Sequence, residues 1–229
     1  PGRTELQTER REEDIPTFIS GLKDGVTCGT PLTAIINNMD FKRSDYNVIS
    51  DMPRPGHVDY AAHVKYKGYE DYSGGGYSSG RLTAPLCIAG GICKQMLSTL
   101  EISIEAKIIE IGGCASDFDK VIAEAKEEGD SVGGIVECRI SGVPAGIGEP
   151  IFDGIENAIA RTMFGIPAVK GIEFGAGFGA SRMRGSDMND EFYYDEDGRV
   201  KTRTNNCGGI LGGISSGMDI VFRVAIKPT

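Results

Sequence analysis

The sequence predicts an α+β fold that contains two similar sheet units. Stretches with the apolar spacing of helices alternate along the chain with strand-like stretches. The expected helices are 84–100, 117–128 and 152–164, and the expected strands of the second half are 101–111, 132–140 and 172–174. A pattern of glycines and apolar residues between Gly21 and Leu32 also recurs, at a constant offset of 188 positions, between Gly209 and Ile220. Such a repeat indicates two related sheet units that would bury one layer between them.

The first part of the chain predicts a charged end, a hairpin and one ambiguous element. Residues 1–14 are charged, which suits an exposed segment. Residues 18–38 indicate a hairpin with its turn at 21–25 and its second strand at 32–36. Residues 57–66 alternate as a strand does, but a preceding proline and two alanines suit a helix equally well. The sequence does not decide between a strand and a helix for this segment.

The helices of the middle carry more specific expectations. Helix 84–100 is apolar on nearly every side, so it should be buried on most sides, and Gly90-Gly91 would permit close packing. Helix 117–128 should have Ser116 as its N-cap and Gly129 as its stop.

The rest of the chain shows no sign of a second domain. Residues 182–203 are polar and predict an exposed hairpin or a mobile loop. No stretch has the composition of a linker between domains, so a single domain is expected over residues 1–229.

Composition excludes several classes of function. A net charge of −9 leaves no basic footprint for nucleic acid, and no run of about 18 apolar residues would span a membrane. The first residues do not have the pattern of a signal peptide. The six cysteines show no CxxC motif and no metal-like pairing with the two histidines. We therefore expect reduced, mostly buried thiols, no metal site and a cytoplasmic protein.

The stretch 54–81 carries the side chains best suited to chemistry. A Pro-Gly turn precedes His57, whose imidazole suits proton transfer near neutral pH. The stretch ends in a glycine run at 74–76, the hydroxyls of Ser78-Ser79 and the guanidinium of Arg81, just before a helix begins. Glycines admit a ligand to the backbone, and a helix start with an arginine suits an anion. A phosphate site is one interpretation, and a flexible surface loop is the other.

Three long motifs resemble those of the chorismate synthase family, in the family's order and over nearly the whole chain. They are RPGHVDY, KY and GGGYSSGR within 54–81, DSVGGIVECRISGVPAGIGEPIFD at 130–153, and TNNCGGILGGISSGMDIVFRVAIKPT at 204–229. The first motif departs from the family's pattern at Val58, Tyr77, Gly80 and Leu82. The resemblance implies a β-α-β sandwich with pseudo-repeated sheets around a helical layer.

The resemblance also implies an activity and a set of site residues. The activity is a lyase reaction of the shikimate pathway: 1,4-elimination of phosphate from 5-enolpyruvylshikimate 3-phosphate, which gives chorismate and requires reduced flavin mononucleotide (FMN) without net redox change. His57 matches the family histidine that transfers a proton. The implied flavin contacts are Tyr77, Ser78, Ser79, Pro167, Ala168, Gly212, Lys227, Pro228 and Thr229. The implied substrate contacts are Arg54, Arg81 and Arg10.

Two differences from the family bear on these expectations. Pro167 stands where the family usually has asparagine, which removes an amide side chain and a backbone N–H donor. Family members also carry further segments at both ends, with a GESHG-like histidine and several arginines, so we expect this chain to be a truncated form. The family further implies a homo-oligomer, most often a tetramer. The alternative is a non-catalytic scaffold that binds flavin or phosphate, which anaerobic turnover with reduced FMN would distinguish.

Overall fold

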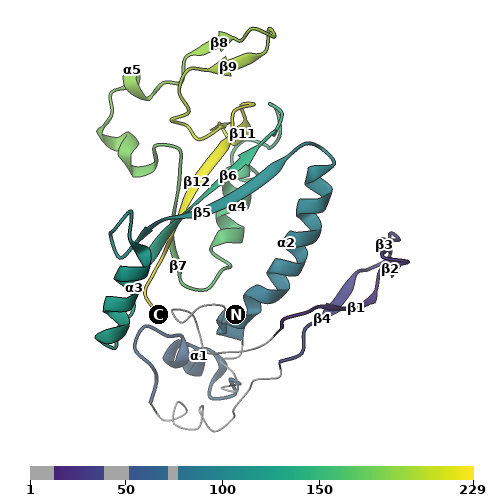
Figure 1. Ribbon diagram of the computed structural model, residues 1–229, viewed down its shortest axis with the longest axis vertical. Helices are drawn as coiled ribbons and strands as arrows, with labels where there is room; N and C mark the ends of the chain where they lie inside the picture. The colour runs from purple at the N-terminus through teal and green to yellow at the C-terminus, as the bar shows by residue number, and fades with distance from the viewer. Residues whose placement is uncertain (1–12, 39–51, 72–76) are drawn as a thin grey trace. The chain divides into compact units, whose positions relative to one another are not determined.

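The computed structural model describes residues 13–38, 52–71 and 77–229 of the chain (Figure 1). These residues fall into two compact units, Pro1–Ile92 and Cys93–Thr229, and each unit is described by itself. Helices and several antiparallel sheets occur together, which confirms the α+β class. The expectation of a single domain stays a prediction.

The described residues of unit 1 form two small antiparallel sheets and a short helix. Its elements are β1 (Thr17–Ser20), β2 (Leu22–Lys23), β3 (Val26–Thr27), β4 (Thr33–Ile35), α1 (Asp59–Tyr66), η3 (Gly80–Leu82) and the start of α2 (Thr83–Ser98). Strand β1 pairs with β4 and β2 pairs with β3, so the hairpin predicted for 18–38 is confirmed. The ambiguous segment 57–66 forms α1, which places Asp59 in the first turn, where a carboxylate favours a helix N-terminus.

Unit 2 is built on one four-stranded antiparallel sheet in the order β5-β6-β12-β7 (Figure 1). Its strands are β5 (Ser103–Ile111), β6 (Gly134–Ser141), β7 (Val169–Phe174) and β12 (Ile220–Ile226). The other elements are α3 (Phe118–Glu127), α4 (Ile155–Met163), η4 (Gly177–Arg182), α5 (Gly185–Met188), β8 (Phe192–Tyr194), β9 (Val200–Thr202), β10 (Ile210–Leu211) and β11 (Ile214–Ser215). Predicted strands and helices 101–174 are confirmed in type and order.

One face of this sheet carries the core. Alternate residues of the central strand β12, namely Ile220, Phe222 and Val224, are buried with Val169 and Ile210. Helix α4 packs against them through its apolar side, because its apolar residues recur at three- and four-residue spacing. The partly buried residues at this contact include Ile155, Ile159, Met163, Ile172 and Phe174.

Charged residues occupy the opposite face in a row across all four strands. The strand register aligns Lys107 with Glu137, Glu137 with Arg223 and Arg223 with Glu173. Glu137 lies 3.2 Å from Lys107 and 3.1 Å from Arg223, and Arg223 lies 3.3 Å from Glu173. Burial raises the pKa of Glu137, but hydrogen bonds and charges from Lys107 and Arg223 outweigh it and leave that pKa lowered.

The two stretches that share the repeated pattern form hairpins with the same local backbone. Strands β2 and β3 pair in the same register as β10 and β11, 188 positions later. The two glycines that begin these hairpins, Gly21 and Gly209, both have positive φ, at 89° and 80°. Each accepts a backbone hydrogen bond from the residue seven positions on, Cys28 and Ser216 respectively. Two distant stretches of sequence therefore fold into the same turn.

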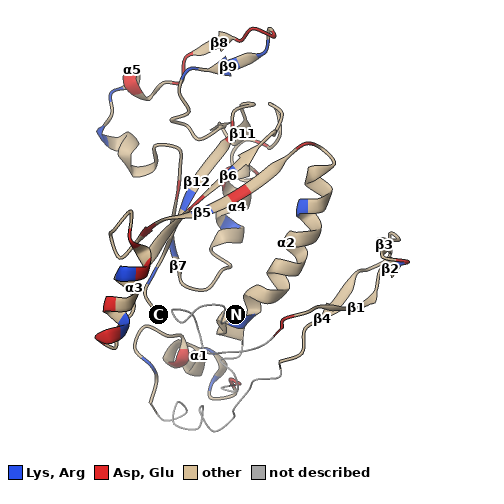
Figure 2. Ribbon diagram, in the orientation of Figure 1, with Lys and Arg blue, Asp and Glu red and all other residues tan. Residues whose placement is uncertain are grey.

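The polar stretch 182–203 forms the predicted hairpin, and several local expectations need correction. Acidic side chains gather at the tip of the β8–β9 hairpin (Figure 2). The N-cap of α3 is Asp117, with φ 54°, and not Ser116. Helix α4 begins at Ile155 rather than 152, because Gly154 is extended and Ile151 has a positive φ of 68°.

Burial was the least accurate of the sequence expectations. In α2, Leu86 and Met96 are 48% and 65% exposed, and no described atom lies within 4 Å of a Cβ built at Gly90 or Gly91. The prediction of a helix buried on most sides is therefore wrong here, because the described elements leave its apolar surface uncovered. All six cysteines are free, and four are exposed, so mostly buried thiols were also a wrong prediction. Along the described chain, no helix is long and apolar enough to cross a membrane.

Candidate active site

His57 lies between the Pro-Gly turn and α1, beside a buried carboxylate. Its Nδ1 is 2.5 Å from Oδ1 of Asp59, and its side chain is 30% exposed. The turn is closed by a hydrogen bond from the His57 amide to the Arg54 carbonyl oxygen. Gly56 adopts the left-handed conformation, with φ 69°, that this turn requires. The local backbone thus presents the imidazole to solvent on one side and to Asp59 on the other.

Asp59 is the centre of the cluster. Its Oδ2 accepts from the backbone N–H and from Nε of Arg54, at 3.0 and 2.8 Å, and its Oδ1 accepts from Nη2 of the same side chain at 2.9 Å. The carboxyl is 7% exposed. The hydrogen bonds from Arg54 hold the pKa of Asp59 well below its usual range, against the burial that raises it.

A cavity of about 640 Å³ lies next to this cluster within unit 1. Arg54 and Asp59 line it, and so do Tyr77 and Ser78, two of the predicted flavin contacts. The other lining residues are Val58, Ala61, Ala62, Lys65, Tyr66, Tyr69, Glu70, Asp71 and Leu82. Tyrosine rings and aliphatic side chains make its wall suited to a flat aromatic ligand, and its size falls within the usual range for small-molecule sites.

The remaining predicted residues of 54–81 have structural partners. Ser79 caps η3, because its Oγ accepts from the backbone N–H of Arg81 at 3.2 Å. The Arg81 guanidinium lies 2.7 Å from Asp14 and donates to the carbonyl oxygen of Asn37 at 3.2 Å. Through these two contacts Arg81, which is 17% exposed, links its own segment to the segments of Asp14 and Asn37. Arg10 and the glycine run 74–76 lie outside the described residues.

In unit 2, predicted flavin contacts from two separate stretches of the chain meet at one end of the sheet. The amide of Lys227 donates to the carbonyl oxygen of Ala168 at 2.9 Å, where β12 ends beside the start of β7. Ala168, which follows Pro167, has a positive φ of 69°. The carbonyl oxygen of Thr229 accepts from Ser131 Oγ at 2.6 Å, and that of Pro228 accepts from Lys227 Nζ at 2.7 Å.

Gly212 lies at the opposite end of β12, in the turn between β10 and β11 (Figure 1). Its φ is 62°, and no described atom is within 4 Å of a Cβ built there. The structure therefore does not bring Gly212 together with Lys227.

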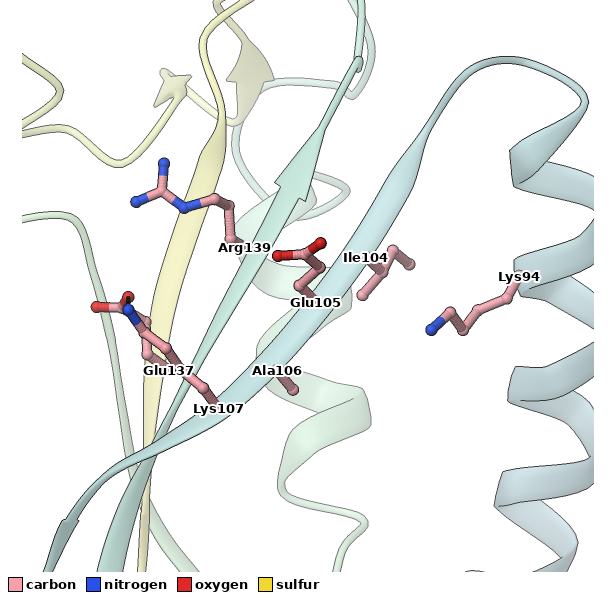
Figure 3. A pocket seen from close by; sticks show the side chains of 7 residues that line it. All are labelled: Lys94, Ile104, Glu105, Ala106, Lys107, Glu137 and Arg139. Carbon is pink, nitrogen blue, oxygen red and sulfur yellow. Dashed lines mark ion pairs between the residues drawn. The ribbon is translucent and has the colours of Figure 1, made fainter.

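A second cavity, of about 420 Å³, lies over the charged face of the unit 2 sheet. Figure 3 shows Lys107 and Glu137 paired on neighbouring strands, with Arg139 and Glu105 further along and Lys94 extending from α2. Arg139 pairs with Asp219 at 2.9 Å. Opposite charges here largely neutralise one another. Over 13–38, 52–71 and 77–229, no group of three or more His, Cys, Asp or Glu side chains could hold a metal ion.

Sequence reasoning missed two carboxylates that organise the groups around them. Asp59 sits two residues after His57 in RPGHVDY, and this short spacing was the signal that could have identified it. Asp190, inside the polar stretch 182–203, accepts hydrogen bonds from Thr204 Oγ1 and from the amides of Asn206 and Cys207, at 2.6, 2.7 and 2.9 Å. Asp190 thereby fixes the loop that leads into β10, and no local pattern of sequence indicates that contact.

Comparison with known proteins identifies relatives over the whole chain. A family model described as chorismate synthase matches residues 1–229. A chorismate synthase of Korarchaeum cryptofilum is 44% identical over 255 residues, which cover 100% of this chain and 70% of that protein. A chorismate synthase of Chitinophaga pinensis is 48% identical over 222 residues, with 97% and 65% covered.

A solved structure described as "Crystal Structure of Chorismate Synthase" matches the fold with a TM-score of 0.79 and 30% sequence identity. The match covers 93% of this chain and 70% of that one. This chain therefore spans 65–70% of the length of these three proteins.

Proposed function

Because this chain belongs to the chorismate synthase family, we propose that it forms most of a chorismate synthase that uses reduced FMN. The reaction is the 1,4-elimination of phosphate from 5-enolpyruvylshikimate 3-phosphate. The bond between the ring carbon and the phosphate oxygen breaks, a ring hydrogen leaves, and a new double bond forms in chorismate. The proposal places the protein in the shikimate pathway, in the cytoplasm and as a homo-oligomer.

The observation that carries the proposal is the His57 imidazole held by Asp59, a carboxylate that lines a cavity together with the predicted flavin contacts Tyr77 and Ser78. An imidazole that is part exposed and fixed by a carboxylate can transfer a proton to or from a bound molecule. His57 would therefore be the acid–base residue of the site.

The residues of this cavity fit the ring system of a flavin better than its phosphate. Tyr66, Tyr69 and Tyr77 offer aromatic surface, and Ser78 offers a hydroxyl. Carboxylates outnumber cations on the same wall, which does not suit a phosphate group. Tyr77 and Ser78 would thus contact the ring. Bound reduced FMN would supply transient electron density for the departure of phosphate.

A second candidate function is a flavin-binding scaffold without turnover. The observation in its favour is that the two predicted substrate arginines among the described residues pair with carboxylates, Arg54 with Asp59 and Arg81 with Asp14. A substrate with several negative charges needs convergent cations, and these two guanidinium groups are already engaged.

Anaerobic turnover with reduced FMN separates the two candidates. We expect phosphate release with the wild-type protein, and a rate about 10²-fold lower for His57→Ala, toward the lower end for a positioned acid. The melting temperature should change little, by the equivalent of about 1–2 kcal/mol at most, because His57 is part exposed. Normal turnover per folded molecule in His57→Ala would refute the role of His57. Failure of the wild-type protein to release phosphate would favour the scaffold.

A further inference from the structure

The contacts around Asp59 determine which nitrogen of His57 can exchange a proton. Arg54 donates three hydrogen bonds to Asp59, and the carboxyl is almost fully buried. Because those bonds lower the pKa of Asp59, the group is an ionised carboxylate and can only accept hydrogen bonds. The nitrogen of His57 that faces it, Nδ1, must therefore carry a proton in every charge state of the imidazole. Only Nε2 is left to gain or lose a proton.

Arg54 also restrains the plane of the imidazole. Its Nη2 lies 2.9 Å from Nδ1 and 3.2 Å from Nε2 of His57. A hydrogen bond in the ring plane to one nitrogen would leave the other well beyond hydrogen-bond range. The guanidinium nitrogen therefore lies against the face of the ring, where an arginine can stack, and the carboxylate Oδ1 bridges it to Nδ1.

We propose that Asp59 is a positioning residue that fixes His57 in the Nδ1–H tautomer, with Nε2 as the proton-transferring atom, and that Arg54 holds Asp59 in place. This inference rests on the proposed role of His57 as the acid–base residue. Arg54, which the sequence predicts as a substrate contact, would then hold the histidine–carboxylate pair in place. Within the described residues, Arg54 and Asp59 make charged contacts with His57, and Lys65, Glu70 and Asp71 line the adjoining cavity.

The protein contains a built-in comparison for this arrangement. His63, the other of its two histidines, places Nδ1 2.8 Å from Oε1 of Glu70. His63 is 58% exposed, against 30% for His57, so solvent competes more strongly for its ring. With only two histidines, nitrogen spectra of ¹⁵N-histidine-labelled protein contain two imidazoles, and a His63→Gln variant assigns them.

The first experiment measures the tautomer of His57 in the neutral protein by ¹⁵N chemical shifts, without flavin or substrate. The wild-type protein is expected to show Nδ1–H, and Asp59→Asn is expected to shift the population toward Nε2–H, the form with Nδ1 free to accept from the new amide. Glu70→Gln is the matched carboxylate-to-amide control and should leave the His57 signals in place. A wild-type His57 in the Nε2–H form would overturn the proposal even where Asp59→Asn fails to fold.

The second experiment asks whether Asp59 acts through His57. Asp59→Asn is expected to lower kcat by about 10-fold or more, and by no more than His57→Ala does, with KM little changed. The double variant should be no slower than His57→Ala alone, because a positioning residue has nothing left to position. Losses that multiply in the double variant would overturn the proposal. Normal turnover in His57→Ala alone would refute the proposed function, while the tautomer measurement still judges the role of Asp59.

Discussion

Arg223 is the residue of the charged row whose loss should cost the most stability. Its guanidinium contacts Glu137 at 3.1 Å, Glu173 at 3.3 Å and the carbonyl oxygen of Gly175 at 3.1 Å. The side chain is 31% exposed, so each contact is worth less than the about 1.5–3 kcal/mol of a buried charged hydrogen bond and more than the surface value of about 0–1. We expect Arg223→Met to lower the free energy of unfolding by about 2–3 kcal/mol.

Lys107→Met is the matched control for that variant. Lys107 belongs to the same row but makes one ion pair at 3.2 Å and is 69% exposed, so the expected loss is about 0–1 kcal/mol. For a protein of this length the Arg223 loss corresponds to a melting temperature lower by roughly 4–12 °C. Thermal unfolding of the two variants and the wild-type protein, side by side, measures the difference. Equal shifts in both variants would refute the inference that central charges in the row contribute more than edge ones.

The pH dependence of the Arg223 effect provides an independent test. The pKa of Glu137 is lowered in the folded protein, so its ionised form stabilises the fold above the unfolded-state value of about 4.3. That contribution is lost as the pH falls through the lower folded-state pKa. The difference between wild type and Arg223→Met should therefore be full at pH 7 and shrink below about pH 4. A difference that stays constant down to pH 3 would contradict the electrostatic explanation.

Three further predictions concern the repeat, the anion contact and the assembly. Gly209→Ala should lower the free energy of unfolding by more than about 3 kcal/mol, because a Cβ there meets the carbonyl oxygen of Asp219. Gly212→Ala should lower it by only about 1–2 kcal/mol, the cost of an alanine at positive φ. Equal losses on chemical denaturation would contradict this prediction. Arg81→Ala should weaken substrate binding far more than Lys65→Ala, and calorimetric titration giving equal dissociation constants would remove Arg81 from the site. Sedimentation at micromolar concentration should give a homo-oligomer, with a tetramer expected, and a monomer would count against this prediction.

Local periodicity predicted the elements well wherever one period dominated. Ile102 to Ile108 alternate strictly with polar residues, and β5 forms there as a half-exposed strand. Residues 57–66 alternate as a strand does, but the preceding proline and two alanines suit a helix equally well, so the sequence alone could not decide. In the structure the segment is helical, and Arg54 bonds to Asp59 in its first turn, a contact between residues five apart that no periodicity records. Short polar contacts of this kind are decided by backbone geometry that only the folded chain supplies.

Burial and long-range charge pairing escaped prediction for a different reason. The row from Lys107 to Glu173 depends on the register between four strands that are far apart in sequence. Each of these charges, taken alone, indicates an exposed polar face and nothing more. For helix α2 the burial itself was predicted wrongly. An apolar sequence indicates that a surface favours burial, but it does not indicate which element would cover that surface. The likeness of the two hairpins could be predicted from sequence, because glycines with positive φ constrain the backbone itself.

The motif match assigned flavin contacts at both ends of β12, and the sheet geometry makes these contacts unequal. Lys227 follows the last residue of β12, whereas Gly212 precedes its first, and seven strand residues span roughly 20 Å. A flavin held by its phosphate at Lys227 would have to extend along the whole strand to reach Gly212. At the Lys227 end, a second stretch of the chain converges through Ala168, whose carbonyl oxygen accepts from the Lys227 amide. At the Gly212 end, none of the other predicted flavin contacts of unit 2 lies nearby among the described residues. Within one chain, a single flavin that contacted Ala168 and Lys227 would therefore not be expected to reach Gly212 as well, so the two ends of β12 are alternative predictions.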